Sequence, residues 1–212
     1  MGESRDLIRV ESSADGQMGT NSYLVQDEAS GDCILIDAHM EPELILAALE
    51  RRSLRPLVIA LTHTDFDHVA GLPALRSALG EIPIAVHPAE RFTLEQGVGL
   101  RTEFSYPQPR FGQLWDLIPG QELAVGSLRV QVLHTPGHSP GGVTLRIGRR
   151  LFTGDALFAG SIGRTDLSRS EPDALLRGIR SELMSLPDDY LVFPGHGSMT
   201  TLGQERRYNP FL

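Results

Sequence analysis

The chain has 212 residues, 41% of them hydrophobic, and a formal charge of −8. This length can bury a sizeable core and predicts a single domain over residues 1–212. The acidic balance disfavours nucleic-acid binding, which needs a basic face, and favours a small-molecule substrate. No segment resembles a signal peptide or reaches the roughly 18 apolar residues of a membrane span, so we expect a cytoplasmic protein without membrane contact.

The first half of the chain alternates apolar runs with turn residues and then becomes helical. An acidic first turn and a last turn with two arginines mark residues 44–52 as a helix. Cys33, the only cysteine, lies in an apolar run and is expected to pack in the core. The expected strands are residues 7–10, 22–25, 33–36, 57–61 and 84–86, and the expected helices are 44–52, 69–79 and 89–96.

The second half opens with an irregular stretch, residues 97–112, which is a candidate lid. Apolar runs separated by glycine turns then predict antiparallel strands. The expected strands are residues 123–125, 128–133, 143–147, 151–153 and 190–193, and the expected helices are 172–186 and 202–208. Two similar halves, each with strands followed by helix, imply an α/β fold: an αββα sandwich of two mixed sheets with helices on the outer faces.

Seven metal-competent side chains follow predicted strands. Four lie within six residues of one another after the strand at 57–61, and three more lie beside glycines in turn-like settings. If all these strand ends meet at one edge of the sandwich, a divalent metal relieves the repulsion between their carboxylates. Mixed histidine and carboxylate ligation suits one or two ions of zinc or iron. The candidates are His63, Asp65, Asp67, His68, His138, Asp155 and His196.

Each of these groups has a plainer interpretation. A lone histidine after Pro-Gly is usually a turn residue, and a lone Gly-Asp is usually a turn or a helix cap. Seven metal-competent residues in four strand-end contexts form a pattern that is far more specific for a metal site. His39, His87 and His134 lack such partners, so we interpret His87 as a strand-end surface residue and the other two as structural histidines.

At these residues the sequence resembles the metallo-β-lactamase superfamily, and within it the small glyoxalase II-like (hydroxyacylglutathione hydrolase-like) enzymes. Six of the seven residues match the signature His-x-His-x-Asp-His, Gly-His, Gly-Asp and Gly-His. The run at residues 154–167 and the ending Asn-Pro-Phe-Leu at 209–212 resemble that subgroup. Full glyoxalase II has a further helical domain, and because this sequence ends at Leu212 we expect the protein to lack it. The resemblance implies that Arg164 helps to hold an anionic thiol conjugate; the alternative is a surface arginine in a turn.

The departure from the signature is Asp65, where the family has histidine. An aspartate oxygen lies as many bonds from its Cα as the ligating nitrogen of that histidine, so Asp65 can reach the same metal. Alternatively, Asp65 does not ligate metal, and only the second site binds an ion. The resemblance implies a first site of His63, Asp65 and His138, a second site of Asp67, His68 and His196, and Asp155 bridging the two.

The leading functional hypothesis is hydrolysis of a thioester, such as a hydroxyacyl-glutathione, by metal-bound hydroxide. Asp67 would orient the nucleophile and take its proton. The alternatives are an iron-dependent persulfide dioxygenase, favoured by the carboxylate at position 65 and by Arg164, and a hydrolase of lactones or other esters. A non-catalytic metal-binding module is a further alternative, motivated by Asp65 alone. The sequence predicts no oligomeric state.

Overall fold

The structure, a computed structural model, describes residues 7–97 and 112–212. The candidate lid at 97–112 lies outside the described residues, apart from its two ends. In the described part of the chain, none of the helices has the length and apolar character needed to cross a membrane.

The first sheet comes from the first half of the chain and has the strand order β1-β2-β3-β4-β5-β6. The first three strands form an antiparallel meander, and β3 to β6 are parallel to one another. The strands β3, β4 and β5 are buried throughout, as expected for parallel strands covered on both faces. The bounds are β1 (Ile8–Ala14), β2 (Asn21–Asp27), β3 (Cys33–Ile36), β4 (Ile59–Ala60), β5 (Ile84–Val86) and β6 (Leu114–Asp116).

The second sheet has the order β14-β13-β10-β9-β8-β7 and is antiparallel except for the β10-β13 pair. A separate hairpin, β11 with β12, follows β10. The bounds are β7 (Glu122–Val125), β8 (Leu128–His134), β9 (Val143–Ile147), β10 (Arg150–Gly154), β11 (Leu157–Phe158), β12 (Ser161–Ile162), β13 (Leu191–Pro194) and β14 (Thr200–Thr201).

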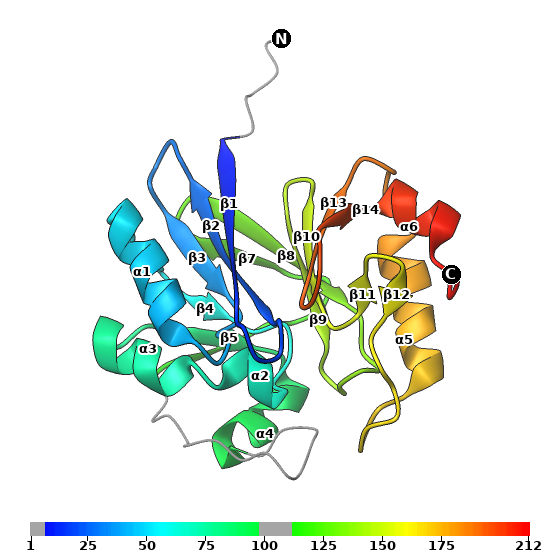
Figure 1. The fold of residues 1–212 in the computed structure, drawn as a ribbon, viewed down its shortest axis with the longest axis horizontal. Coiled ribbons are helices and arrows are strands. Elements are labelled where there is room, and N and C mark those ends of the chain that lie inside the picture. The colour runs from blue at the N-terminus through cyan, green and yellow to red at the C-terminus, as the bar shows by residue number, and fades with distance from the viewer. Residues whose placement is uncertain (1–6, 98–111) are drawn as a thin grey trace.

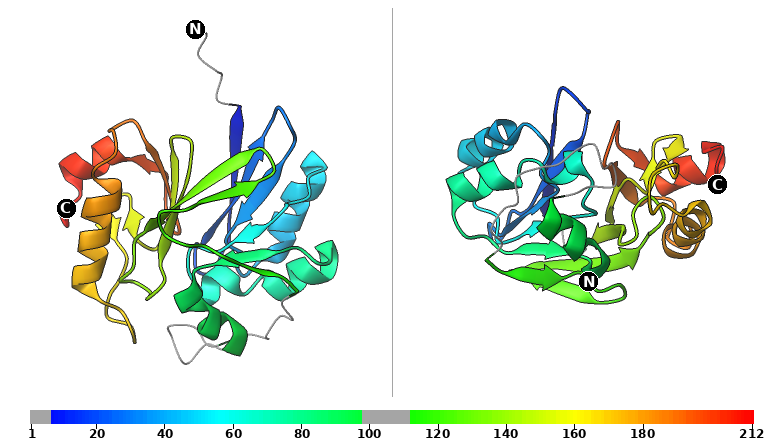
Figure 2. Two further views of the ribbon diagram at one scale, coloured as in Figure 1. Left: turned by 180° about the vertical axis from the view of Figure 1, so that it is seen from behind. Right: turned by 90° about the horizontal axis from the view of Figure 1, so that it is seen from below.

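The two sheets pack face to face and the helices lie outside them, so the expected αββα sandwich is confirmed (Figures 1 and 2). One buried apolar cluster fills the space between the sheets, and two others lie between each sheet and its helices. Cys33 is fully buried, and burial raises the pKa of its thiol to about 12, which confirms its packing role. The helices are α1 (Pro42–Arg52), α2 (Phe66–Val69), α3 (Leu72–Leu79), α4 (Arg91–Gln96), α5 (Pro172–Gly178) and α6 (Leu202–Tyr208).

Two expected helices are divided. The helix expected at 69–79 becomes α2 and α3, because the Gly71 N–H donates to the Ala38 carbonyl oxygen at 3.0 Å rather than within the helix, and Pro73 in the first turn of α3 has no N–H. Since α2 begins at Phe66, Asp67 and His68 lie on a helical turn, and only His63 and Asp65 lie on the loop where the whole cluster was expected. The helix expected at 172–186 is α5 followed by a π-helical turn, residues 179–183.

Candidate metal centre

Five segments bring the seven predicted ligands to one edge of the sandwich. His63 and Asp65 follow β4, Asp67 and His68 belong to α2, and His138 lies on the loop between β8 and β9. Asp155 and His196 follow β10 and β13, the parallel pair of the second sheet, so both leave the sheet at the same edge.

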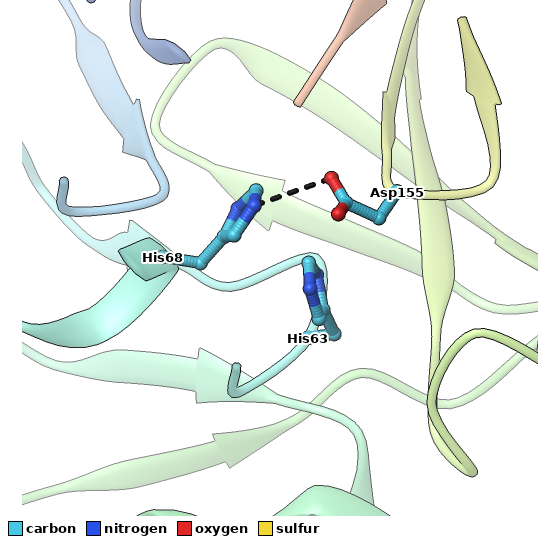
Figure 3. Close-up of side chains that lie close together, drawn as sticks. All are labelled: His63, His68 and Asp155. Carbon is cyan, nitrogen blue, oxygen red and sulfur yellow. Dashed lines mark ion pairs between the residues drawn. The ribbon is translucent and has the colours of Figure 1, made fainter. Parts of the chain in front are cut away.

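Two groups have ligand atoms that all lie within 4.8 Å of one another: His63, His68 and Asp155, and Asp67, His68 and His196. Figure 3 shows His63 and His68 extending from adjacent turns towards Asp155. Asp155 joins the two groups, because its Oδ1 is 3.2 Å from His68 Nε2 and its Oδ2 is 3.4 Å from His196 Nε2. His138 Nε2 is 3.6 Å from the same Oδ2, as expected for a carboxylate placed between two metal positions.

Asp37 fixes the orientation of His68. The Asp37 carboxylate accepts hydrogen bonds from the Thr62 backbone N–H and hydroxyl, both at 2.8 Å, and from His68 Nδ1 at 2.9 Å. The hydrogen on His68 therefore sits on Nδ1, and Nε2 faces the cluster. Asp37 has a φ of +58°, a conformation that costs free energy in a non-glycine residue and is concentrated at functional sites.

The other two buried histidines are oriented in the same way. His138 Nδ1 donates to the Arg164 carbonyl oxygen at 2.9 Å. The Thr62 hydroxyl already donates to Asp37, so at 3.1 Å it accepts from His63 Nδ1. In all three side chains Nδ1 holds a hydrogen and Nε2 faces the centre, where it would present a lone pair to a bound metal.

Four buried polar atoms at this edge have no hydrogen-bond partner among the described residues: His63 Nε2, His68 Nε2, His138 Nε2 and Asp155 Oδ1. Buried polar atoms are almost always paired, so four unpaired atoms that converge at one edge fit a bound cation. His68 Nε2 and Asp155 Oδ1 face each other at 3.2 Å, which is repulsive unless a proton or a metal ion lies between them. The donor set of imidazoles and carboxylates fits zinc or iron.

The electrostatics favour ionised carboxylates. Burial by itself would raise the pKa of Asp67, but the charge of His68 and hydrogen bonds from His196 and Thr20 lower that pKa below its usual range. Burial also opposes ionisation of Asp155, and the surrounding histidines again lower its pKa well below the usual value. Burial and the neighbouring His68 lower the pKa of His63 to about 4, which keeps this imidazole neutral and able to ligate at pH 7.

Asp65 caps α2, since its Oδ1 accepts a hydrogen bond from the Phe66 N–H at 2.9 Å. It is buried and lines a cavity of about 290 Å³ at the centre. Arg164 lines the same cavity, and its guanidinium forms two hydrogen bonds, at 2.7 and 2.8 Å, to the carboxylate of Asp166. The cavity is lined by Met18, Asp65, His138, Asp155, Phe158, Ile162, Arg164 and His196.

The sequence patterns do not identify three supporting residues: Asp37, Thr20 and Glu90. The fully buried Thr20 hydroxyl donates to Asp67 Oδ2 at 2.6 Å. Glu90 accepts hydrogen bonds from Thr64 and from the Gly141 N–H. Only Asp37 carries a local signal, a carboxylate placed directly after the apolar strand β3.

Of the predicted ligands, Asp65 and His138 belong to neither group of ligand atoms but line the cavity. The three remaining histidines neither belong to a group nor line that cavity. His39 is fully buried and hydrogen-bonded to Ser13 through Nε2 at 2.9 Å, in agreement with a structural role. His87 is only half-buried and stacks on His134, with ring centroids 5.2 Å apart. His87 is therefore part of a packed pair rather than a simple surface residue.

The fold and the site define an αββα protein with a histidine and carboxylate centre suited to divalent metal. The chain belongs to the Metallo-beta-lactamase superfamily, whose sequence model matches residues 15–196. Members of this superfamily are metallo-hydrolases. This confirms the family resemblance that the ligand motifs indicate.

Similar proteins include the hydroxyacylglutathione hydrolase GloC of Haemophilus influenzae, 35% identical over 196 residues, which cover 91% of this chain and 92% of that protein. Among solved structures, TTHA1623 in a di-iron-bound form is 40% identical, with a TM-score of 0.84, and the match covers 96% of this chain and 100% of the other. The BLEG-1 B3 metallo-beta-lactamase is 34% identical, with a TM-score of 0.87 and coverages of 96% and 99%.

Proposed function

We propose that this chain is a cytoplasmic, divalent-metal-dependent hydrolase of thioesters of small thiols, such as a hydroxyacyl-glutathione. The observation that carries the proposal is the set of three Nε2 lone pairs and one carboxylate oxygen that converge, buried and without hydrogen-bond partners, at the strand ends. The similarity to a hydroxyacylglutathione hydrolase supports the choice of substrate class.

Two ions would be held by this chain. The first site would use His63, Asp65 and His138, and the second Asp67, His68 and His196, with Asp155 shared between them. Bound there, a divalent ion supplies Lewis acidity and lowers the pKa of water towards about 7. The position of Asp155 supports this division, because its Oδ2 lies 3.6 Å from Nε2 of His138 and 3.4 Å from Nε2 of His196.

The side chains around the centre would orient the reactants. Asp67 is held by Thr20, and its lowered pKa keeps it an ionised acceptor that orients the attacking water. Phe158 and Ile162 on the β11–β12 hairpin give the cavity an apolar wall, which suits an acyl chain. A thiolate leaves without strong acid assistance, so the reaction does not require a general acid.

The deciding experiment measures hydrolysis of glutathione thioesters by zinc-loaded and iron-loaded protein. Chelator-treated protein and Asp155→Asn serve as controls, because Asn cannot neutralise two cations. A panel of lactones, simple esters and a β-lactam, assayed in parallel, ranks the alternative substrates. We expect thioesters to be cleaved with the highest kcat/KM; absence of any metal-dependent ester or thioester hydrolysis contradicts the proposal.

A second candidate is an iron-dependent persulfide dioxygenase. It is supported by the third carboxylate, Asp65, in the wall of the cavity and by the similarity to a di-iron-bound protein. Histidine and carboxylate ligation with open positions suits ferrous iron. This candidate predicts oxygen uptake with glutathione persulfide by the iron-loaded protein and none by the zinc-loaded protein.

A further inference from the structure

Glu90 is a buried carboxylate outside the ligand set. It ends a 3₁₀ turn after β5, and its exposed fraction is 1%. Burying a carboxylate is unfavourable unless it is hydrogen-bonded or paired with a charge. Within residues 7–97 and 112–212 no arginine pairs with Glu90, and hydrogen bonds satisfy the carboxylate instead.

The two oxygens of Glu90 bind the two loops that carry the proposed first-site ligands. Glu90 Oε2 accepts from the Thr64 hydroxyl at 2.5 Å, and Thr64 lies between His63 and Asp65. Glu90 Oε1 accepts from the Gly141 N–H at 2.7 Å, three residues beyond His138. One carboxylate thus connects the ligand loop of the first sheet to the ligand loop of the second.

The contact with the second loop is close. A Cβ at Gly141 would lie 2.7 Å from Glu90 Cγ and 2.7 Å from His87 Nδ1, so the loop backbone is packed directly on these side chains. On the other side, Thr93 donates to the Glu90 carbonyl oxygen at 2.8 Å and its hydroxyl contacts that of Thr64 at 2.5 Å. Glu90 is therefore fixed at both its backbone and its carboxylate.

We propose that Glu90 is a positioning residue for the first metal site, which sets the separation of His63 and Asp65 from His138. The inference rests on the proposed metal centre. Glu90 hydrogen-bonds to the loops at Thr64 and Gly141 and not to the segments that carry Asp67, His68 and His196, so we expect it to affect the second site less than the first. The substitution that removes this connection weakens one of the two sites more than the other.

The test is a zinc titration against a chromophoric chelator. In Glu90→Ala we expect one of two binding events to weaken by about 10- to 100-fold, the usual effect of removing a residue that holds a ligand in place. Glu90→Gln should restore binding to within about threefold of wild type, because its amide oxygen can accept from Gly141 and its NH₂ can donate to Thr64.

Glu205→Ala is the matched control. Glu205 is equally buried and likewise accepts a backbone N–H and a threonine hydroxyl, from Gly160 and Thr200, away from both loops. We expect it to change the stability of the protein and neither zinc affinity. An equal loss of zinc affinity in Glu205→Ala and Glu90→Ala would mean that general destabilisation causes the loss, and this would overturn the inference.

The outcomes separate the two proposals. A wild-type chain that binds no zinc, or one ion only, overturns the two-metal centre and the inference together. A wild-type chain with two ions whose Glu90→Ala variant titrates identically overturns the inference alone. If Glu90→Ala does not fold, Thr64→Val cuts only the connection to the first loop; an unchanged affinity in that variant also overturns the role of Glu90.

Discussion

His68 and Asp37 form the hydrogen bond that prepares the centre: Nδ1 lies 2.9 Å from Asp37 Oδ2, both side chains are buried, and Nε2 is left facing Asp155. The same carboxylate oxygen accepts from the Thr62 hydroxyl, which in turn accepts from His63. Asp37 thereby orients one imidazole directly and a second through Thr62.

Asp37→Asn should weaken metal binding by about 10- to 100-fold. Asn tolerates the positive φ at this position, so the backbone is retained. Its amide NH₂ would face His68 Nδ1 and move the imidazole hydrogen to Nε2, towards the metal. Chelator competition measures the loss. Asp32→Asn, the same change at a half-buried aspartate at the other end of β3, should bind metal like wild type. Equal affinities in the two variants would contradict the orienting role of Asp37.

Thr20→Val should lower both metal affinity and kcat. The valine is similar in shape but cannot donate to Asp67 Oδ2, and a buried hydrogen bond to a charged group contributes about 1.5–3 kcal/mol. Thr20→Ser keeps the hydroxyl and should remain close to wild type. Metal titration and steady-state kinetics on the two variants measure the difference. Equal behaviour of the two would show that Thr20 only fills space.

Asp65 is tested by metal content. We expect two ions per chain in wild type and about one in Asp65→Ala, measured by elemental mass spectrometry, as the two-site division of ligands predicts. Alanine also removes the α2 cap, at a cost of about 0.5–2 kcal/mol. Asp65→Ser retains a capping oxygen and separates the two effects: it should lose the ion with less loss of stability. Two ions retained in both variants would make Asp65 a helix cap alone.

The stability of chelator-treated protein should fall as pH rises from about 6.5 to about 9. Burial opposes protonation of His196, but hydrogen bonds to Asp155 and Asp67 raise its pKa from 6.5 to about 9. A group with a raised folded-state pKa contributes its full stabilisation below its unfolded pKa and loses it as pH rises through the folded value. The raised pKa of His68, where the neighbouring carboxylates outweigh the effect of burial, acts in the same direction.

Denaturant midpoints of the chelator-treated protein, measured across this pH window, give the slope of stability against pH. His196→Gln should reduce it, whereas His134→Gln should not, because burial lowers the pKa of His134 and places its titration below the window. A slope that is the same in wild type and His196→Gln would contradict the assignment to His196.

Arg164→Gln should raise KM for an anionic thioester by about tenfold with little change in kcat, since a charge-assisted hydrogen bond distant from the reacting carbonyl affects binding alone. His138 uses the backbone oxygen of Arg164, so this substitution preserves the imidazole contact. Asp166→Asn weakens the pair that occupies the guanidinium and should lower KM. An unchanged KM in both variants would place Arg164 outside the substrate site.

Much of the fold could be predicted because local sequence patterns indicate most of its strands and helices. Buried runs such as residues 33–36 and the periodicity of residues 44–52 match β3 and α1 closely. The additional strands β6, β11, β12 and β14 have only two or three residues, too short for a periodic signal. The division between α2 and α3 depends on the long-range hydrogen bond from the Gly71 N–H to the Ala38 carbonyl oxygen, although Pro73 in the first turn of α3 is a local signal for it.

The sequence by itself determined the seven candidate ligands, because metal-competent side chains recur after its predicted strands; that these segments share one edge was decided by the sheet topology. Only the tertiary structure decided which groups orient them. Asp37 is 31 residues from His68, Thr20 is 47 from Asp67, and Glu90 is 51 from Gly141. A hydrogen bond requires donor and acceptor to lie within about 3 Å, and over such separations the packing of the two sheets alone sets that distance.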